Sequence, residues 1–373
     1  MKILFACILI SNVLALYQDE QWVPRRTIYR GGSQKPQFDS FHPEKCEQIG
    51  TDRKCPPILM TLGLGHSGTT ILNYWLLGIK VQKAKRNASE GGVHTFELVN
   101  SVIGKETKFF DTYKRLTSRE IQRNYVNLFK SFDKPTSNLQ PQSQELQELP
   151  SSHQLSIDFT PGVGRCARSI VVENIYTSFP NMKFLVFLRD PVEWLYSATY
   201  CKSAKSFDTW ARRHIGGPHG FPLSTCFAPV ISSFFTRFNR SRFLFIPNHY
   251  MRQYPGDVLL DVIDFLGLQV LNEAEARART NANQTEVGKD MPEYMKFHLG
   301  VSKANEKESI QNSTRQFVGE RTCHCLEDLH TLLDLEKPLF STFPCPAESP
   351  ELKQQRKMAM KTSCKDWTRC RSR

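Results

Sequence analysis

Residues 63–70 read Gly-Leu-Gly-His-Ser-Gly-Thr-Thr. They follow the apolar run 58–62 and precede a second apolar stretch, 71–77, so the order is strand, tight turn, helix. Glycines let the backbone fold closely enough for several N–H groups to point at one phosphate, and the helix start adds its positive dipole end. The stretch therefore predicts an anion-binding cradle. An ordinary strand-to-helix turn is the alternative interpretation.

The cradle departs from the nucleotide P-loop at one position. The spacing of Gly63 and Gly68 matches GxxxxGK[ST], but Thr69 stands where that motif has lysine. Without the lysine, binding of a magnesium-nucleoside triphosphate is disfavoured. A kinase-like enzyme is therefore the weakest of the functions that the sequence suggests.

A second segment predicts a cation beside the cradle. Residues 183–188 have the composition of a buried parallel strand, and Arg189-Asp190-Pro191 ends it, with proline at the first position of a helix. Ser197 lies about two helical turns after Pro191, so a guanidinium and a hydroxyl can converge on one anion. The alternative is a helix-capping Asp190 next to a structural Arg189.

Together these segments resemble the sulfotransferase family, which uses 3′-phosphoadenosine 5′-phosphosulfate as co-substrate. The resemblance implies an α/β three-layer, P-loop-like fold with a central parallel sheet. It implies that Arg189 and Ser197 bind the 3′-phosphate. The implied 5′-phosphosulfate loop consists of Gly65, His66, Ser67, Gly68, Thr69 and Thr70.

Two further segments extend the resemblance over residues 56–345, and its closest form is the heparan sulfate 3-O- and N-sulfotransferases. Residues 155–161, ending in Thr160-Pro161, are similar to a strand that ends in Thr-Pro in those enzymes. Residues 242–247 lead to Asp264-Phe-Leu-Gly-Leu268, which is similar to the family's late strand and the helix end after it. Four motifs in the right order are more specific than one.

The resemblance also implies a catalytic base. Residues 105–111, Lys-Glu-Thr-Lys-Phe-Phe-Asp, are similar to the segment that carries the catalytic glutamate, so Glu106 would be the base and Lys108 would contact substrate. The same charge alternation before two phenylalanines is typical of an amphipathic helix edge. The other candidate bases are Glu90, His94 and Glu97.

His66 stands where heparan sulfate sulfotransferases place a lysine that stabilises the leaving phosphate. Imidazole does this work only when it is protonated. Its unperturbed pKa is about 6.5, and phosphate and sulfate charges favour the protonated form. The hypothesis is that His66 is the electrophilic partner. The alternative is a loop histidine that only hydrogen-bonds the turn.

Two late positions complete the comparison. Residues 317–321 fall where the family has a basic loop over the nucleotide, which implies contact of Arg321 with the 3′-phosphate or adenine. His249 falls where many relatives carry a glutamate at the end of a strand.

The charge favours an anionic partner. The chain has 49 Lys and Arg against 37 Asp and Glu, a formal net charge of +12. A secretory signal and paired cysteines argue against nucleic acid, so a sulfated glycan such as heparan sulfate is the expected acceptor.

The N-terminus predicts export. Residues 1–15 are interpreted as a cleaved signal peptide, with an uncleaved Golgi anchor as the alternative, and only the anchor would give a membrane attachment. The expected location is the secretory pathway, as a Golgi-lumenal or secreted protein. Removing Cys7 from the 11 cysteines leaves an even number, which favours disulfides. The sequons are Asn87, Asn239, Asn283 and Asn312.

No metal is assigned. Cys323-His324-Cys325 with His330 fits no common zinc finger, and disulfides are the expected fate of cysteines in an exported chain.

The expected organisation is one main domain. Residues 16–55 are interpreted as a stem, 56–345 as the sulfotransferase domain and 346–373 as a basic tail containing cysteine. The expected function is sulfuryl transfer to a hydroxyl or amine of a glycan. The alternative is a non-catalytic relative that binds the nucleotide or a sulfated glycan.

Overall fold

The computed structural model describes residues 46–63, 67–83, 95–101, 107, 109–112, 117–132, 153–160, 169–200, 206–215, 226–281, 310–335, 339–340 and 345. Residues 1–15, most of the segment 16–55, and the tail 346–373 lie outside these ranges. The sequons at Asn87 and Asn283 also lie outside them, whereas Asn239 and Asn312 are exposed. No helix within the described ranges is long and apolar enough to cross a membrane.

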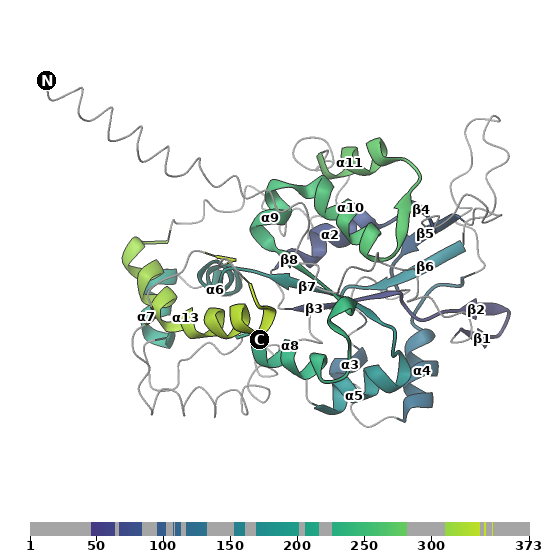
Figure 1. The fold of residues 1–373 in the computed structure, drawn as a ribbon, viewed down its shortest axis with the longest axis horizontal. Coiled ribbons are helices and arrows are strands. Elements are labelled where there is room, and N and C mark those ends of the chain that lie inside the picture. The colour runs from purple at the N-terminus through teal and green to yellow at the C-terminus, as the bar shows by residue number, and fades with distance from the viewer. Residues whose placement is uncertain are drawn as a thin grey trace, which may run out of the picture.

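A seven-stranded sheet forms the centre of the molecule (Figure 1). Its strands are β3 (Leu59–Gly63), β4 (Lys80–Lys83), β5 (Thr95–Val99), β6 (His153–Asp158), β7 (Lys183–Leu188), β8 (Phe243–Pro247) and β9 (Leu268–Val270). Their order is β8-β7-β3-β6-β5-β4-β9, and β4 runs in the direction opposite to that of the other six strands. The predicted α/β fold with a central parallel sheet is therefore confirmed.

Helices cover both faces of the sheet. One layer comprises α2 (Thr69–Leu76), α9 (Asn248–Gln253), α10 (Pro255–Phe265) and α11 (Glu273–Asn281). The opposite layer comprises α3 (Phe109–Thr112), α4 (Ser118–Val126), α5 (Ser169–Ser178), α6 (Pro191–Tyr200), α7 (Phe207–Ile215), α8 (Ala228–Phe235) and α13 (Asn312–Leu333). In Figure 1 the first layer lies above the sheet, with α3, α4, α5 and α8 below it. The molecule thus has the predicted three layers.

The alternation of side chains along β7 explains the two hydrophobic cores. Phe184, Val186 and Leu188 belong to the core under the larger layer, whereas Leu185 and Phe187 belong to the core under α2, α9 and α10. Successive strand residues point to opposite faces, so a strand covered on both faces is apolar throughout. The prediction of a buried strand over residues 183–188 is confirmed.

A short hairpin precedes β3. Its strands are β1 (Glu47–Ile49) and β2 (Asp52–Lys54), and the Cys46–Cys55 disulfide joins its ends. The amide of Phe132 donates to the carbonyl oxygen of Arg53 at 2.7 Å. Part of the segment assigned to a stem therefore pairs with the folded unit.

Two more disulfides join described residues, Cys226–Cys325 and Cys323–Cys345. Cys226 precedes α8, and the other partners lie on α13 or beyond it. The expectation that the cysteines form disulfides is confirmed for these pairs.

Candidate functional site

Three parallel strands end side by side at one edge of the sheet. Gly63 at the end of β3 lies opposite Phe187 of β7, and Leu188 at the end of β7 lies opposite Pro247 of β8. In open α/β sheets, ligands bind outside the carboxyl ends of the strands. The predicted phosphosulfate loop and Arg189 therefore follow adjacent strand ends, although the sequence separates them widely.

The described part of the loop has the features of an anion cradle. Gly68, with φ of 104°, begins α2 as its N-cap, and no acidic residue lies in the first turn. The first amides of a helix have no partner within the helix and attract anions. Ser67 is fully buried, and its hydroxyl has no hydrogen-bond partner among the described residues. A buried, unpartnered hydroxyl at a helix start is suited to a phosphate or sulfate oxygen.

Helix α9 holds the cradle in place. The Nδ2 atom of Asn248 donates to the carbonyl oxygen of Ser67 at 2.9 Å. A Cβ atom on Gly68 would lie 2.2 Å from Cε of Met251 and 3.0 Å from Nδ2 of Asn248. A side chain at position 68 would therefore require Met251 and Asn248 to shift. Sequence reasoning missed Asn248, and its only signal is a polar residue directly after a buried strand.

Arg189 lies half-buried directly after β7. Burial, followed by the nearby positive charge of Arg252, lowers the pKa of Arg189 to about 10, so the guanidinium is charged at neutral pH. Asp190 caps α6, because its Oδ1 accepts from the amide of Glu193 at 3.0 Å. Burial raises the pKa of Asp190. The capping role considered for Asp190 is thus present.

Two other predicted residues lie on helices. Ser197 is partly buried on α6. The expectation of a loop at residues 317–321 is wrong, because these residues lie within α13. Val318 and Thr322, four residues apart, are both buried on this helix. Arg321 is exposed, and its guanidinium lies 4.6 Å from the ring centroid of Phe317. No described contact connects Arg321 with the cradle.

A buried polar network lies at the end of β6, the other neighbour of β3. Asp158 accepts hydrogen bonds from the hydroxyls of Thr107 (2.8 Å), Tyr125 (2.5 Å) and Thr160 (2.6 Å). Burial raises the pKa of Asp158, and burial and the Asp158 charge raise the pKa of Tyr125. Thr107 stands between Glu106 and Lys108 in the sequence. A hydrogen bond to Asp158 therefore anchors Thr107, the described residue between the predicted base and Lys108.

Several predicted residues lie outside the described ranges, namely Gly65, His66, Glu90, His94, Glu106 and Lys108. Glu97 is described, and it lies on β5 opposite Gln154, near the start of β6. Since Asp158 ends β6, Glu97 lies away from the carboxyl edge, and the structure disfavours it as the base.

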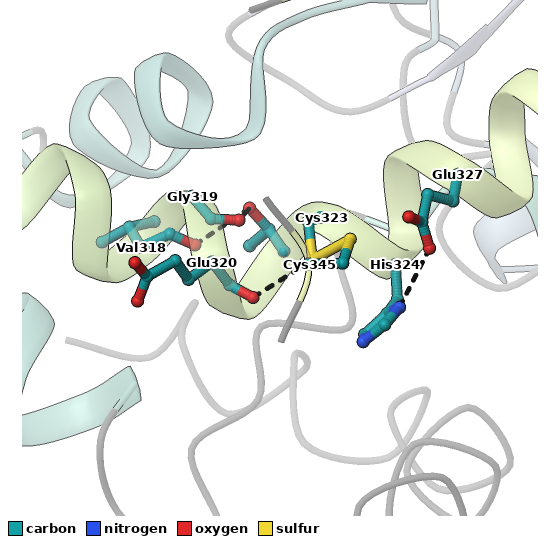
Figure 2. The surroundings of a disulfide bond; sticks show 8 residues. Val318, Gly319, Glu320, Cys323, His324, Glu327 and Cys345 are labelled. Carbon is teal, nitrogen blue, oxygen red and sulfur yellow. Dashed lines mark hydrogen bonds and ion pairs between the residues drawn. A yellow bond between two sulfur atoms is a disulfide. The ribbon is translucent and has the colours of Figure 1, made fainter. Parts of the chain in front are cut away.

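The cysteine–histidine cluster on α13 is a disulfide site. The ligand atoms of Cys323, His324 and Cys345 lie within 4.8 Å of one another. Figure 2 shows that the two sulfur atoms are bonded and that His324 points toward Glu327, with Nδ1 3.0 Å from Oε2. Bonded sulfurs offer no thiolate to a metal. We therefore assign this cluster to covalent cross-linking.

No protein-family model and no curated protein matches the chain. Solved structures do resemble it. One is a sulfotransferase from Alicyclobacillus acidocaldarius, with 14% identity, a TM-score of 0.45, and coverage of 76% of this chain and 98% of that chain. Another is mouse sulfotransferase SULT7A1 complexed with PAP, with 11% identity, a TM-score of 0.39, and coverage of 78% of this chain and 98% of that chain.

A third is the sulfotransferase domain of the Synechococcus PCC 7002 olefin synthase, with 18% identity, a TM-score of 0.35, and coverage of 73% of this chain and 97% of that chain. With identities of 18% or less and TM-scores of 0.45 or less, these likenesses establish no activity, substrate or cofactor for this chain.

Proposed function

We propose that the chain is a sulfotransferase that moves the sulfuryl group of 3′-phosphoadenosine 5′-phosphosulfate to a hydroxyl or amine of an anionic glycan. The observation that carries the proposal is the buried hydroxyl of Ser67, which has no hydrogen-bond partner among the described residues. Ser67 lies directly before α2, in the turn after β3, and β3 is the neighbour of the strand that Arg189 follows.

The described residues fit this nucleotide. Ser67, Thr69 and Thr70, together with the first amides of α2, would hold the 5′-phosphosulfate, and Arg189 with Ser197 would hold the 3′-phosphate. The bound nucleotide supplies an activated sulfuryl group. Thr69 in place of the P-loop lysine disfavours a nucleoside triphosphate at the same site.

The chain's own side chains have three tasks in this reaction. Glu106 would accept the proton of the attacking hydroxyl or amine, and Lys108 would bind the acceptor. Thr107, between them, donates a hydrogen bond to Asp158 at the end of β6. His66 would supply positive charge at the departing oxygen. Positioning of the reactants and electrostatic stabilisation account for most of the catalysis in the related phosphoryl transfers, so sulfuryl transfer requires no further type of catalytic group.

The role of His66 predicts a pH dependence. Protonated imidazole is required, and its unperturbed pKa is about 6.5, so activity falls as pH rises above neutrality. In His66→Lys the positive charge persists to higher pH, and activity at pH 8 recovers. Initial rates from pH 5.5 to 8.5 measure this. An identical profile for wild type and variant removes His66 from the mechanism.

The proposed acceptor is heparan-sulfate-like. Its support is the similarity of residues 105–111 to heparan sulfate sulfotransferases and the net charge of +12, which attracts polyanions. We further propose that the protein works in the secretory pathway, in the Golgi lumen or outside the cell, where its disulfides persist. Nucleic acid is not a proposed partner.

The decisive experiment uses purified chain, radiolabelled nucleotide donor, and desulfated heparan, chondroitin, keratan and peptide acceptors. Transfer to heparan, abolished in Arg189→Ala and retained in the exposed α4 variant Arg123→Ala, supports the proposal. Transfer to another acceptor corrects the substrate class. Nucleotide binding without any transfer favours the non-catalytic alternative, and magnesium-dependent ATP turnover favours a kinase-like enzyme.

A further inference from the structure

Helix α9 presents a second arginine toward the cradle. Residues three and four apart share a face of a helix, so Asn248, Met251 and Arg252 lie on one side of α9. Asn248 bonds the Ser67 carbonyl, and Met251 fills the space beside Gly68. Arg252 continues this face and is exposed. Its guanidinium therefore leaves α9 on the side of the loop, where an anion would bind.

Arg189 approaches the same place from β7. Leu185 and Phe187 point into the core under α2, α9 and α10, and Arg189 continues this alternation by one residue. The charge of Arg252 lies close enough to disfavour the protonated form of Arg189. Two guanidiniums, one half-buried and one exposed, therefore converge outside the ends of β7 and β8.

Both carboxylates near Arg189 have a further partner. The carboxylates that act on Arg189 are Asp190 and Glu193. Asp190 caps α6, and Glu193 forms an ion pair with Arg315 at 2.7 Å. None of the ion pairs among the described residues includes Arg252. Like charges at short range are unfavourable unless an anion lies between them, and a phosphate accepts several guanidinium hydrogen bonds at once.

We propose that Arg252 is a second guanidinium of the nucleotide site and binds, together with Arg189, the 3′-phosphate of 3′-phosphoadenosine 5′-phosphosulfate. This inference rests on the proposed function. It gives α9 two roles that have no recognisable motif in the sequence. Asn248 and Met251 contact the loop that would bind the 5′-phosphosulfate. Arg252 binds the 3′-phosphate, the group that adenosine 5′-phosphosulfate lacks.

Calorimetric titration of the full chain with two nucleotides tests the inference. Adenosine 3′,5′-bisphosphate carries the 3′-phosphate, and adenosine 5′-phosphate lacks it. Arg252→Ala should weaken binding of the bisphosphate roughly 10- to 100-fold and change binding of the monophosphate by less than about 2-fold. Arg252→Lys, which keeps the charge and loses the planar fork, should give an intermediate loss.

The control is Arg123→Ala, which removes an exposed arginine from α4 and so matches the change in net charge. Melting temperatures of all variants establish that each one folds. Equal bisphosphate affinity in Arg252→Ala and Arg123→Ala overturns the inference, as does an equal loss for both nucleotides. A wild-type chain that binds neither nucleotide overturns the proposed function itself, so the two failures are distinguishable.

Discussion

Gly68 occupies a backbone position that favours glycine for two separate reasons. Its φ of 104° is rarely adopted by residues with a side chain, and a Cβ would meet Met251 and Asn248. We predict that Gly68→Ala lowers the free energy of unfolding by about 1–3 kcal/mol and abolishes binding of adenosine 3′,5′-bisphosphate. Urea denaturation and calorimetric titration measure the two effects.

A double variant separates the two reasons. The nearest atom to the added methyl group is the end of the flexible Met251 side chain, so Gly68→Ala/Met251→Ala removes the close contact and leaves the backbone strain. Met251→Ala alone is the reference for the cavity that this change creates. We expect only partial recovery of nucleotide binding. Full recovery would show that the backbone conformation tolerates a side chain.

We expect the hydrogen bonds of Asp158 to stabilise the fold and also to position Thr107. It is fully buried, and it holds Thr107 beside the predicted base. We predict that Asp158→Asn lowers the free energy of unfolding by about 1–3 kcal/mol, because an amide cannot accept all the hydrogen bonds that the carboxylate accepts. We also expect a fall in kcat larger than any change in nucleotide affinity.

Tyr125→Phe is the matched control for Asp158→Asn. It removes one donor to Asp158 and leaves the Thr107 hydrogen bond in place. Its stability should fall while kcat stays close to that of the wild type. If both variants lose kcat in proportion to stability, Asp158 has no positioning role.

Candidate site residues could be named from the sequence where a local motif carries them. Ser67 and Arg189 belong to short strand-turn-helix segments whose chemistry is visible in the sequence. Asn248 is different, because its partner Ser67 lies 181 residues away. Two residues that contact each other across such a sequence separation form no motif of fixed spacing. The same holds for Arg252, because its proposed role can be recognised only once α9 is known to pack against the loop.

At the scale of elements, the buried strands were the most predictable parts. Residues 183–188 form β7 with the predicted limits, because an apolar run between turn residues predicts a buried strand well. The family resemblance placed a late strand at residues 242–247, and β8 begins one residue later, at Phe243. The reversed strand β4 was not foreseen, since its direction depends on pairing with β5 and β9. Residues 317–321 were misassigned because a family position was preferred to the helical spacing of Val318, Thr322 and Leu329.

The end of α13 contains a pH-sensitive contact. The amide of Leu339 donates to Nε2 of His330 at 3.1 Å, which requires neutral imidazole, and burial lowers the pKa of His330. The unfolded chain therefore binds the proton more tightly than the folded chain does. This contribution to stability is complete above the unfolded pKa of about 6.5 and is lost as pH falls through the lower folded pKa.

We predict that the wild type is less stable at pH 5.5 than at pH 7.5 and that His330→Gln reduces this difference. Urea denaturation at both pH values measures it. The control is Thr331→Gln, at the next, exposed position of the same helix, which changes no titratable group. Burial also lowers the pKa of His249, whose ring contacts Phe340, so part of the slope remains in His330→Gln. Identical slopes in all three proteins contradict the assignment.

At the scale of the molecule, Cys226–Cys325 connects α8 to α13 across a sequence separation of 99 residues. In the chain-entropy account, a disulfide that closes a longer loop restricts the unfolded chain more. We predict that Cys226→Ser/Cys325→Ser lowers the free energy of unfolding by about 2–4 kcal/mol. The midpoint and slope of urea denaturation measure the loss.

The hairpin disulfide provides the comparison. Cys46–Cys55 has a sequence separation of only 9 residues, so Cys46→Ser/Cys55→Ser should destabilise the chain less. A greater loss in the hairpin variant would show that local packing, and not loop length, determines what these cross-links contribute.

The contact between Asn248 and Ser67 also bears on biosynthesis. During translation the loop before α2 emerges long before α9, and 181 residues must be added before its clamp exists. Pairing across such separations is slow relative to local helix formation. The loop before α2 consequently gains this contact only after α9 has been made, and a nascent chain released before residue 248 would carry the recognisable glycine motif without the side chain that holds it.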